Sequence, residues 1–233
     1  MKTFLAKLLC RAFPLVVLFL AACGGGGGGG AAPLTPLFAY VANSGDNTVS
    51  AYTINGTTGA LTQIASSPFA AGTQPNSVTV DPSGKFAYVA NTGGNVSAYT
   101  INATSGVLTP VAGSPFAAGA NPLSVTVDPS GTFVYVANAG NPGPNGSSGN
   151  NVSAYTLNAT TGALTEVAGS PFAAGGAPQS VKVDPSGKFA YVANMSGISA
   201  YTITATSGAL TPVAGSPFAA GGGPDSVAVG KPK

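Results

Sequence analysis

Apolar and polar residues alternate in short runs along most of this chain, and the period of an amphipathic helix is missing after residue 30. The run Phe86–Asn91 reads FAYVAN. In a strand, Phe86 and Tyr88 point to one face and Val89 to the other, because successive side chains alternate across a sheet. Apolar residues on both faces are typical of a strand that is covered on both sides. The pattern predicts an all-β protein.

The FxYVAN run marks an internal repeat. It begins at four phenylalanines that are 48, 47 and 56 residues apart, namely Phe38, Phe86, Phe133 and Phe189. A period of this size is typical of one blade of a β-propeller. We therefore expect a repeat domain over residues 38–233, built from four units that start at these phenylalanines.

Each unit predicts four short strands. The FxYVAN strand is followed by a VSAYT-type strand, a short LTxx strand and, after a loop that reads SPFAAG, an SVxV strand. Pro110 and Pro212 lie in two of the LTxx strands and cannot donate to a ladder, which places these strands at the outer edge of their sheets. The VSAYT-type strands are Val49–Ile54, Val96–Ile101, Val152–Leu157 and Ile198–Ile203.

A DPSG turn follows three of the SVxV strands, at Asp81, Asp128 and Asp184. Asp at the first position accepts a backbone hydrogen bond, Pro presets φ at the second position, and Gly suits the last. The carboxylates could instead serve as metal ligands or as acids. Turn chemistry explains them better, because they are spread one to a unit and do not form a dense calcium loop.

Four-stranded units arranged around an axis form a β-propeller, here with the strand before DPSG innermost. This chain begins with the second strand of a blade and ends with the first. We expect the ring to close by pairing of Ser226–Val229 with Phe38–Asn43, so that one blade is built from both ends of the repeat domain. The alternative is that the chain is half of a larger, eight-bladed ring in a dimer. The sequence leaves the oligomeric state open.

The N-terminal residues predict where in the cell the protein is located. Lys2, Lys7 and Arg11 lie before or at the edge of an apolar run, residues 13–20, that is too short to span a bilayer as a mature helix. The sequence Leu-Ala-Ala-Cys that ends at Cys23 resembles the lipobox of bacterial lipoproteins. An ordinary secretory signal that happens to contain a cysteine is the alternative.

The lipobox resemblance implies a lipoprotein signal peptide over residues 1–22 and a lipid attached to Cys23. Residues 23–37 would then hold the lipidated cysteine and a Gly-rich linker, which is a flexible kind of chain. The membrane is accordingly the expected partner, through the lipid anchor. Gly24 after the cysteine favours the outer membrane of a Gram-negative bacterium, by the same resemblance.

Composition excludes several classes of function. Only 6% of the residues are charged and 44% are hydrophobic, which is too apolar for a disordered chain. Without residues 1–22 the chain has five lysines against six acidic residues, a net charge of −1, so no basic patch is available for a nucleic acid. Histidine is absent and Cys23 is the one cysteine left, so we expect no metal site and no cofactor.

Candidate catalytic groups are equally few. Lys182 replaces the threonines of the corresponding inner strands, Thr79 and Thr126, and is the one side chain expected at the central channel that carries a charge. Glu166 belongs to an outer strand, remote from that channel. Because a lone lysine without a carboxylate or imidazole partner is a poor active site, we assign no catalytic residue.

Differences between the units indicate where a ligand would bind. The third unit carries an insert, Gly140–Asn150, on the face of the SPFAAG loops, which is the usual ligand face of a propeller. A protein or a carbohydrate is the kind of ligand that this face suggests, although a tolerated insertion explains the segment as well. The phenylalanines of the SPFAAG loops could contact a ligand or pack between blades; they are Phe69, Phe116, Phe172 and Phe218.

The recurring motifs resemble one known family. YVAN, VSAYTI, GxLTPV and SVxVDPSGKF are similar to the repeats of the YVTN and lactonase-type propellers, whose namesake is the bacterial 6-phosphogluconolactonase. The resemblance covers about residues 38–230. It implies a β-propeller and a lactone-hydrolysing activity. The family is seven-bladed, whereas this chain supplies four units.

Two functions follow from these observations. The scarcity of acid and base groups favours a non-enzymatic, lipid-anchored envelope module for binding or surface interaction. The alternative is a lactonase-like hydrolase, which the family resemblance alone supports, and an envelope structural protein without a ligand is a third possibility. We therefore expect no enzymatic activity, and a lactone hydrolase if the expectation fails.

Overall fold

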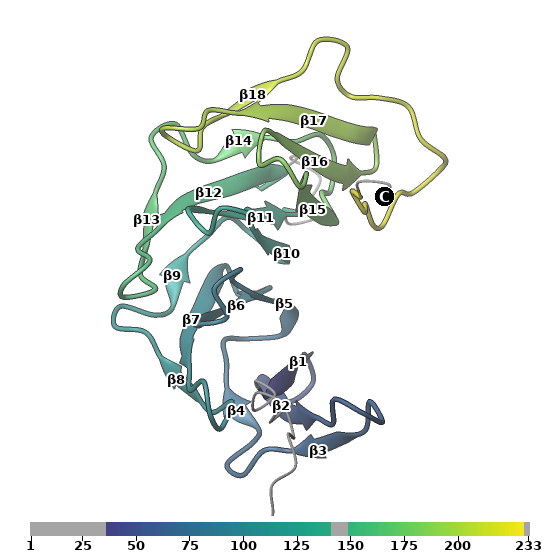
Figure 1. Cartoon of the computed structure of the whole chain (residues 1–233). Helices are drawn as coiled ribbons and strands as arrows, with labels where there is room; N and C mark the ends of the chain where they lie inside the picture. Colours follow the sequence, from purple (N-terminus) through teal and green to yellow (C-terminus); the bar gives the residue numbers. More distant parts are fainter. Residues whose placement is uncertain (1–35, 141–148, 231–233) are drawn as a thin grey trace, which may run out of the picture. The chain divides into compact units, whose positions relative to one another are not determined.

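The computed structural model describes residues 36–140 and 149–230, all within one unit of the chain, Thr35–Lys233. The described residues form four antiparallel sheets and no helix, which confirms the all-β prediction (Figure 1). Within these residues, no helix is long and apolar enough to cross a lipid bilayer. Cys23 and the predicted signal peptide lie outside the described residues.

The sheets are built from the same kinds of strand. The inner strands end at or just before the DPSG turns and are β5 Pro75–Val80, β10 Pro122–Val127 and β15 Ser180–Val183. The motif strands carry FxYVAN and are β1 Leu37–Asn43, β6 Phe86–Asn91, β11 Phe133–Asn138 and β16 Phe189–Asn194. The middle strands are β2 Thr48–Ile54, β7 Asn95–Ile101, β12 Asn151–Leu157 and β17 Gly197–Ile203. The outer strands are β3 Leu61–Gln63, β8 Leu108–Pro110, β13 Leu164–Glu166 and β18 Leu210–Pro212.

In three sheets the strand order is inner, motif, middle, outer, for example β5-β6-β7-β8. The first sheet contains β1, β2 and β3 and lacks an inner strand. Every residue of β6 and β11 is buried, as the apolar residues on both of their faces predicted. Among the described strands, β8 and β18 pair with one neighbour each, so Pro110 and Pro212 lie at sheet edges as expected.

The SPFAAG segments are not simple loops. Three of them contain a two-residue strand that pairs with the start of a middle strand, namely β4 Phe69–Ala70, β9 Phe116–Ala117 and β14 Phe172–Ala173. A middle strand has seven residues and its outer neighbour three, so the short strand satisfies backbone groups that the outer strand does not reach. The three phenylalanines pack against the apolar core, whereas Phe218 is 45% exposed.

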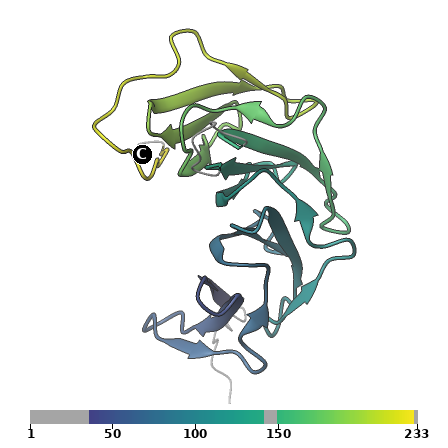
Figure 2. The same cartoon turned by 180° about the vertical axis from the view of Figure 1, so that it is seen from behind.

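Successive sheets pack against one another in chain order, from β1–β4 to β15–β18 (Figures 1 and 2). The inner strand β10 contacts both β5 and β15, which confirms that the strand before DPSG is the innermost of its sheet. Three clusters of buried apolar side chains fill the spaces between the sheets. The cluster between the first two sheets is the smallest, because the first sheet has no inner strand to cover its neighbour.

Tyrosine hydroxyls join neighbouring sheets. Those of the motif strands donate to a glycine carbonyl in the hairpin of the following sheet, in the pairs Tyr40–Gly106, Tyr88–Gly162 and Tyr135–Gly208, each at 2.9 Å. Those of the middle strands donate to an alanine carbonyl in the preceding sheet, in the pairs Tyr99–Ala70, Tyr155–Ala117 and Tyr201–Ala173, each at 2.6 Å. Every sheet-to-sheet contact thus uses the same two bonds.

The predicted closure of the ring within one chain is wrong. Of the described strands, β1 pairs with β2 alone, and Ser226–Val229 does not form a strand. The Val227 N–H instead donates to the Ser180 hydroxyl of β15, at 3.5 Å, so this segment lies beside the last sheet (Figures 1 and 2). The rotation between packed sheets, and not the sequence likeness of the end segments, decides whether the two ends meet.

Candidate functional site

The DPSG aspartates hold backbone turns, as the turn chemistry predicted. Asp128 is buried, and its Oδ1 accepts hydrogen bonds from the N–H groups of Thr132 (2.8 Å) and Phe133 (2.7 Å). Its Oδ2 accepts from the N–H of Ser130 at 3.1 Å and from the Ser130 hydroxyl at 2.5 Å. Asp81 and Asp184 are bonded in the same way. The carboxylates are therefore committed to the turns.

Asp184 is the most solvent-accessible of the three. Partial burial acts to raise the pKa of its carboxyl group, but hydrogen bonds from the Ser186 hydroxyl and from backbone N–H groups outweigh that effect, and the net result is a lowered pKa. The group is ionised at neutral pH. No group of three or more histidine, cysteine or acidic residues that could hold a metal occurs in residues 36–140 and 149–230.

The asparagine of each YVAN run ties two strands together, a role that sequence reasoning did not assign. The buried Asn91 side chain donates from Nδ2 to Asn95 Oδ1 (2.8 Å) and to Ser97 Oγ (2.9 Å). A Cβ atom at Gly72 would lie 2.6 Å from Asn91 Nδ2, so the SPFAAG backbone approaches the amide closely. The asparagine recurs at the same place in every unit, and this repetition is the signal that marks it as structural.

Lys182 lies on the inner strand β15, as predicted, and its side chain is exposed. Its partner across the sheet is Tyr191 of β16. Glu166 lies on the outer strand β13, opposite Tyr155, so the structure does not bring this carboxylate to the inner edge of the sheet. Sequence reasoning placed both residues correctly, and they do not form a pair.

The base of the Gly140–Asn150 insert joins the loops that connect β14 to β15. The Asn150 side-chain oxygen accepts from the N–H of Ala177 at 3.0 Å, and the Asn150 carbonyl accepts from that of Ala174. A Cβ atom at Gly149 would lie 2.1 Å from the Gly140 Cα, so Gly149 requires glycine, and the φ of +74° at Gly140 favours glycine there as well. The insert therefore begins and ends on the face of the SPFAAG segments, as expected, while residues 141–148 lie outside the described part.

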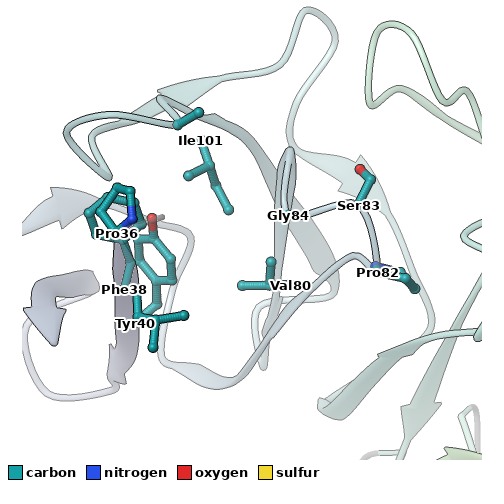
Figure 3. Close-up of a pocket in the computed structure, with 10 residues that line it drawn as sticks. Pro36, Phe38, Tyr40, Val80, Pro82, Ser83, Gly84 and Ile101 are labelled. Atoms are coloured by element: carbon teal, nitrogen blue, oxygen red, sulfur yellow. The ribbon is translucent and has the colours of Figure 1, made fainter. Parts of the chain in front are cut away.

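A cavity of about 600 Å³ lies between the motif strand β1 and the turn that joins β5 to β6 (Figure 3). Its walls are mainly apolar and include Phe38, Val80 and Ile101. Among the described residues of the lining, Tyr40 and Ser83 contribute the only polar side chains. Burial raises the pKa of Tyr40 to about 12, so its hydroxyl is neutral and donates to Gly106. The described part of the lining thus offers no group that would activate water at neutral pH.

Stacked antiparallel sheets with innermost strands in mutual contact define the chain as a β-propeller. The sequence model of the lactonase family, described as a seven-bladed β-propeller, matches residues 35–126 and 114–229. The chain therefore belongs to the lactonase family of β-propellers. No curated protein matches the sequence.

Solved structures share the fold. A protein from Bacteroides uniformis, named as a candidate 6-phosphogluconolactonase, is 17% identical over 76% of this chain and 50% of its own, with a TM-score of 0.65. A similarly named protein from Bacteroides fragilis is 20% identical over 82% of this chain and 57% of its own, with a TM-score of 0.63. The periplasmic gluconolactonase of Pseudomonas aeruginosa is 17% identical over 76% and 50%, with a TM-score of 0.62. The chain spans about half the length of these structures.

Proposed function

We propose that this protein is a lactone hydrolase of the lactonase family. The observation that carries the proposal is the match to the family model along all four sheets, residues 35–229. Three solved structures with this fold support the proposal, because they are named as gluconolactonases or candidate 6-phosphogluconolactonases. The substrate class would be sugar lactones, in which a ring ester is opened by water to a hydroxy acid.

The reaction adds water to the lactone carbonyl and breaks the ring carbon–oxygen bond, so a catalyst gains most by stabilising the developing oxyanion. Lys182 is the one cationic side chain on an inner strand of the described residues. We assign it the binding of the carbonyl oxygen or of an anionic group on the sugar. Its ammonium supplies positive charge without requiring a metal ion.

The test is the rate of hydrolysis of gluconolactone and of 6-phosphogluconolactone, followed by acid release and corrected for the spontaneous reaction. We expect the protein to accelerate one of them, and Lys182→Ala to lose at least tenfold in kcat/KM. Lys188→Ala is the matched control, because Lys188 is also exposed but belongs to the DPSG turn. Equal rates with and without the protein would refute the proposal.

Non-enzymatic binding is the second candidate, and the state of the carboxylates favours it. Three of them are bonded to their own turns, and Glu166 lies on an outer strand, away from Lys182. A lactone or sugar acid that binds without being hydrolysed, measured by calorimetry, would support this function. Loss of that binding in Lys182→Ala with no turnover in the native protein would separate it from hydrolysis.

We also propose that the protein is anchored in the cell envelope through a lipid on Cys23, by the likeness of its N-terminal residues to a lipobox. Labelling of growing cells with a palmitate analogue should mark the native protein and leave Cys23→Ser unmarked. Label on both proteins, or on neither, would contradict the proposal. Fractionation of the envelope would then assign the membrane.

A further inference from the structure

The first sheet of the described chain lacks an inner strand, and the last described segment has the sequence of one. The first sheet has a motif, a middle and an outer strand but no inner strand. The C-terminal segment Pro224–Val229 reads PDSVAV and matches the inner strands, which read PNSVTV, PLSVTV and PQSVKV. Among the described residues, this segment pairs with no sheet.

The structure places the C-terminal segment where the inner strand of a following blade belongs. In complete sheets, the second residue of the SVxV run donates its N–H to the serine hydroxyl of the preceding inner strand, as Val125 does to Ser77 and Val181 to Ser124, both at 3.3 Å. Val227 makes the same bond to Ser180. This hydrogen bond, at 3.5 Å, places Val227 beside the last sheet in the position that an inner strand takes beside the preceding one.

The first sheet shows the complementary vacancy. Val41 of β1 is 46% exposed, whereas the equivalent Val89 of β6 is fully buried beneath its neighbours. The following inner strand is also uncovered, because Val80 is 40% exposed. The cavity beside β1 occupies this region (Figure 3). A single inner strand paired with β1 would cover all of these groups.

The inter-sheet contacts of the FxY motif and of the hairpin glycine are also unmade at the two ends of the described chain. Tyr191 makes no side-chain hydrogen bond to a described residue, and Phe189 is 36% exposed whereas Phe86 is 3% exposed. The glycine that would receive them is Gly59 of the first hairpin, where an added Cβ atom would meet no described atom within 4 Å. Gly59 has the same positive φ as the three glycines that do receive such contacts.

We propose that two copies of this chain assemble head to tail into a closed, eight-bladed ring. In each copy, Ser226–Val229 adds the missing inner strand to the first sheet of the other copy. Phe189 and Tyr191 then pack on Gly59 of the partner copy, as their equivalents do within the chain. The inference is independent of the proposed hydrolysis.

Ring geometry favours a second copy over closure of one chain on itself. Neighbouring blades are rotated by about 90° in a four-bladed ring, about 51° in a seven-bladed ring and about 45° in an eight-bladed ring. The family model that this chain matches over residues 35–126 and 114–229 describes seven-bladed propellers, so a rotation near that of seven blades is expected. Eight blades require a small change in that rotation and four blades a large one. Two identical joints related by a two-fold axis would pair the inner edge of the first sheet in both copies.

The register of the new pairing follows from the complete sheets. β15 and β16 place Val181 opposite Val192, and the equivalent pair across the joint is Val227 of one copy and Val41 of the other. Cysteines at these two positions would face one another on paired strands. Ala228 lies one residue out of register with Val41 and directs its side chain to the opposite face.

The first test is the protein mass of the full chain in detergent, by light scattering. We expect two chains, and any other number overturns the proposal. The second test co-expresses Val41→Cys and Val227→Cys on separate chains under mild oxidation. Covalent dimers should form from the mixture, and neither variant alone should exceed the background set by the natural cysteines.

Val41→Cys mixed with Ala228→Cys is the out-of-register control and should cross-link at least tenfold less. A bridge within one chain of the double variant Val41→Cys, Val227→Cys would show that the chain closes on itself and would overturn the proposal. Absence of cross-linking in the mixture would overturn it as well. Because Val41 and Ala228 are exposed and Val227 is half-buried, these variants are expected to fold.

Discussion

The Tyr88 hydroxyl donates a 2.9 Å hydrogen bond to the carbonyl oxygen of Gly162, which lies 74 residues further along the chain. The bond connects the motif strand of one sheet to the hairpin of the next. Phe86 packs on the same glycine, because a Cβ atom there would lie 2.4 Å from its ring. One tight turn thus receives both aromatic residues of the FxY motif, and this contact sets the spacing of neighbouring sheets.

Tyr88→Phe should lower the free energy of unfolding by about 1–2 kcal/mol, because it leaves a buried carbonyl group without its donor. The ring of the new phenylalanine keeps the packing of the tyrosine. Urea denaturation of both proteins measures the difference. A change below about 0.5 kcal/mol would show that the inter-sheet bond contributes little.

Gly162→Ala should be more damaging, at about 2–5 kcal/mol. The residue has φ +76°, which disfavours a side chain, and the new methyl group would overlap the buried Phe86 ring. Gly59→Ala is the matched control, since Gly59 has φ +72° and nothing within 4 Å of an added Cβ. Within a single chain it should cost about 1 kcal/mol, from the backbone alone.

Gly59→Ala also has a consequence for assembly. In the eight-bladed ring, Gly59 faces Phe189 of the partner copy, so its new methyl group would obstruct the joint as the one at Gly162 obstructs the corresponding contact within the chain. We expect the variant to be monomeric at concentrations at which the native protein is a dimer, as measured by light scattering. An unchanged dimer would contradict this assignment of the joint.

Acid should destabilise the protein through Asp184. Its pKa is lower in the folded state than in the unfolded chain, so its ionised form stabilises the fold above the unfolded value of about 4. This contribution is lost as the pH falls through the folded pKa. Asp184→Asn should therefore reduce the loss of stability between about pH 5 and pH 2, measured by denaturant unfolding at each pH. An identical pH dependence in both proteins would exclude the effect.

Alkali should also destabilise the protein, through its buried tyrosines. Burial raises the pKa of Tyr40 and of Tyr155 to about 12. For Tyr155, a hydrogen bond with the Ser153 hydroxyl lowers the pKa in part, and the nearby charge of Glu166 raises it. Their contribution to stability is full below about pH 10 and is lost as the pH rises toward 12. Tyrosinate absorbance should rise together with unfolding, and ionisation of all tyrosines near pH 10 without unfolding would contradict it.

Most of each sheet could be predicted from the sequence, because the interactions that define it are local. In the DPSG turn, the carboxylate of Asp128 accepts hydrogen bonds from backbone N–H groups within five residues. Pro110 indicates an outer edge strand because proline has no backbone N–H to donate. The strand within SPFAAG was missed. Phe116 and Ala117 pair with residues that lie about twenty positions earlier, and no periodic pattern marks two residues as a strand.

The sequence predicted the strands on which two candidate residues lie, but not the surroundings of the site. Sequence reasoning placed Lys182 on an inner strand and Glu166 on an outer one, and the structure agrees. It could not anticipate the apolar cavity beside β1, because that cavity exists only where one sheet lacks a strand that the other sheets have. Nor did it assign the YVAN asparagine, whose partners come from the adjacent strand.

The sequence alone was sufficient for the all-β class, the four repeats and the order of inner, motif, middle and outer strands in three of the sheets, since alternation, turn residues and spacing act within about fifty residues. The tertiary structure decided whether Ser226–Val229 reaches β1. That outcome depends on the rotation between packed sheets, which adds up over several interfaces of aromatic and aliphatic side chains. The local sequence pattern does not determine this rotation, so only the tertiary structure shows whether the two end segments pair.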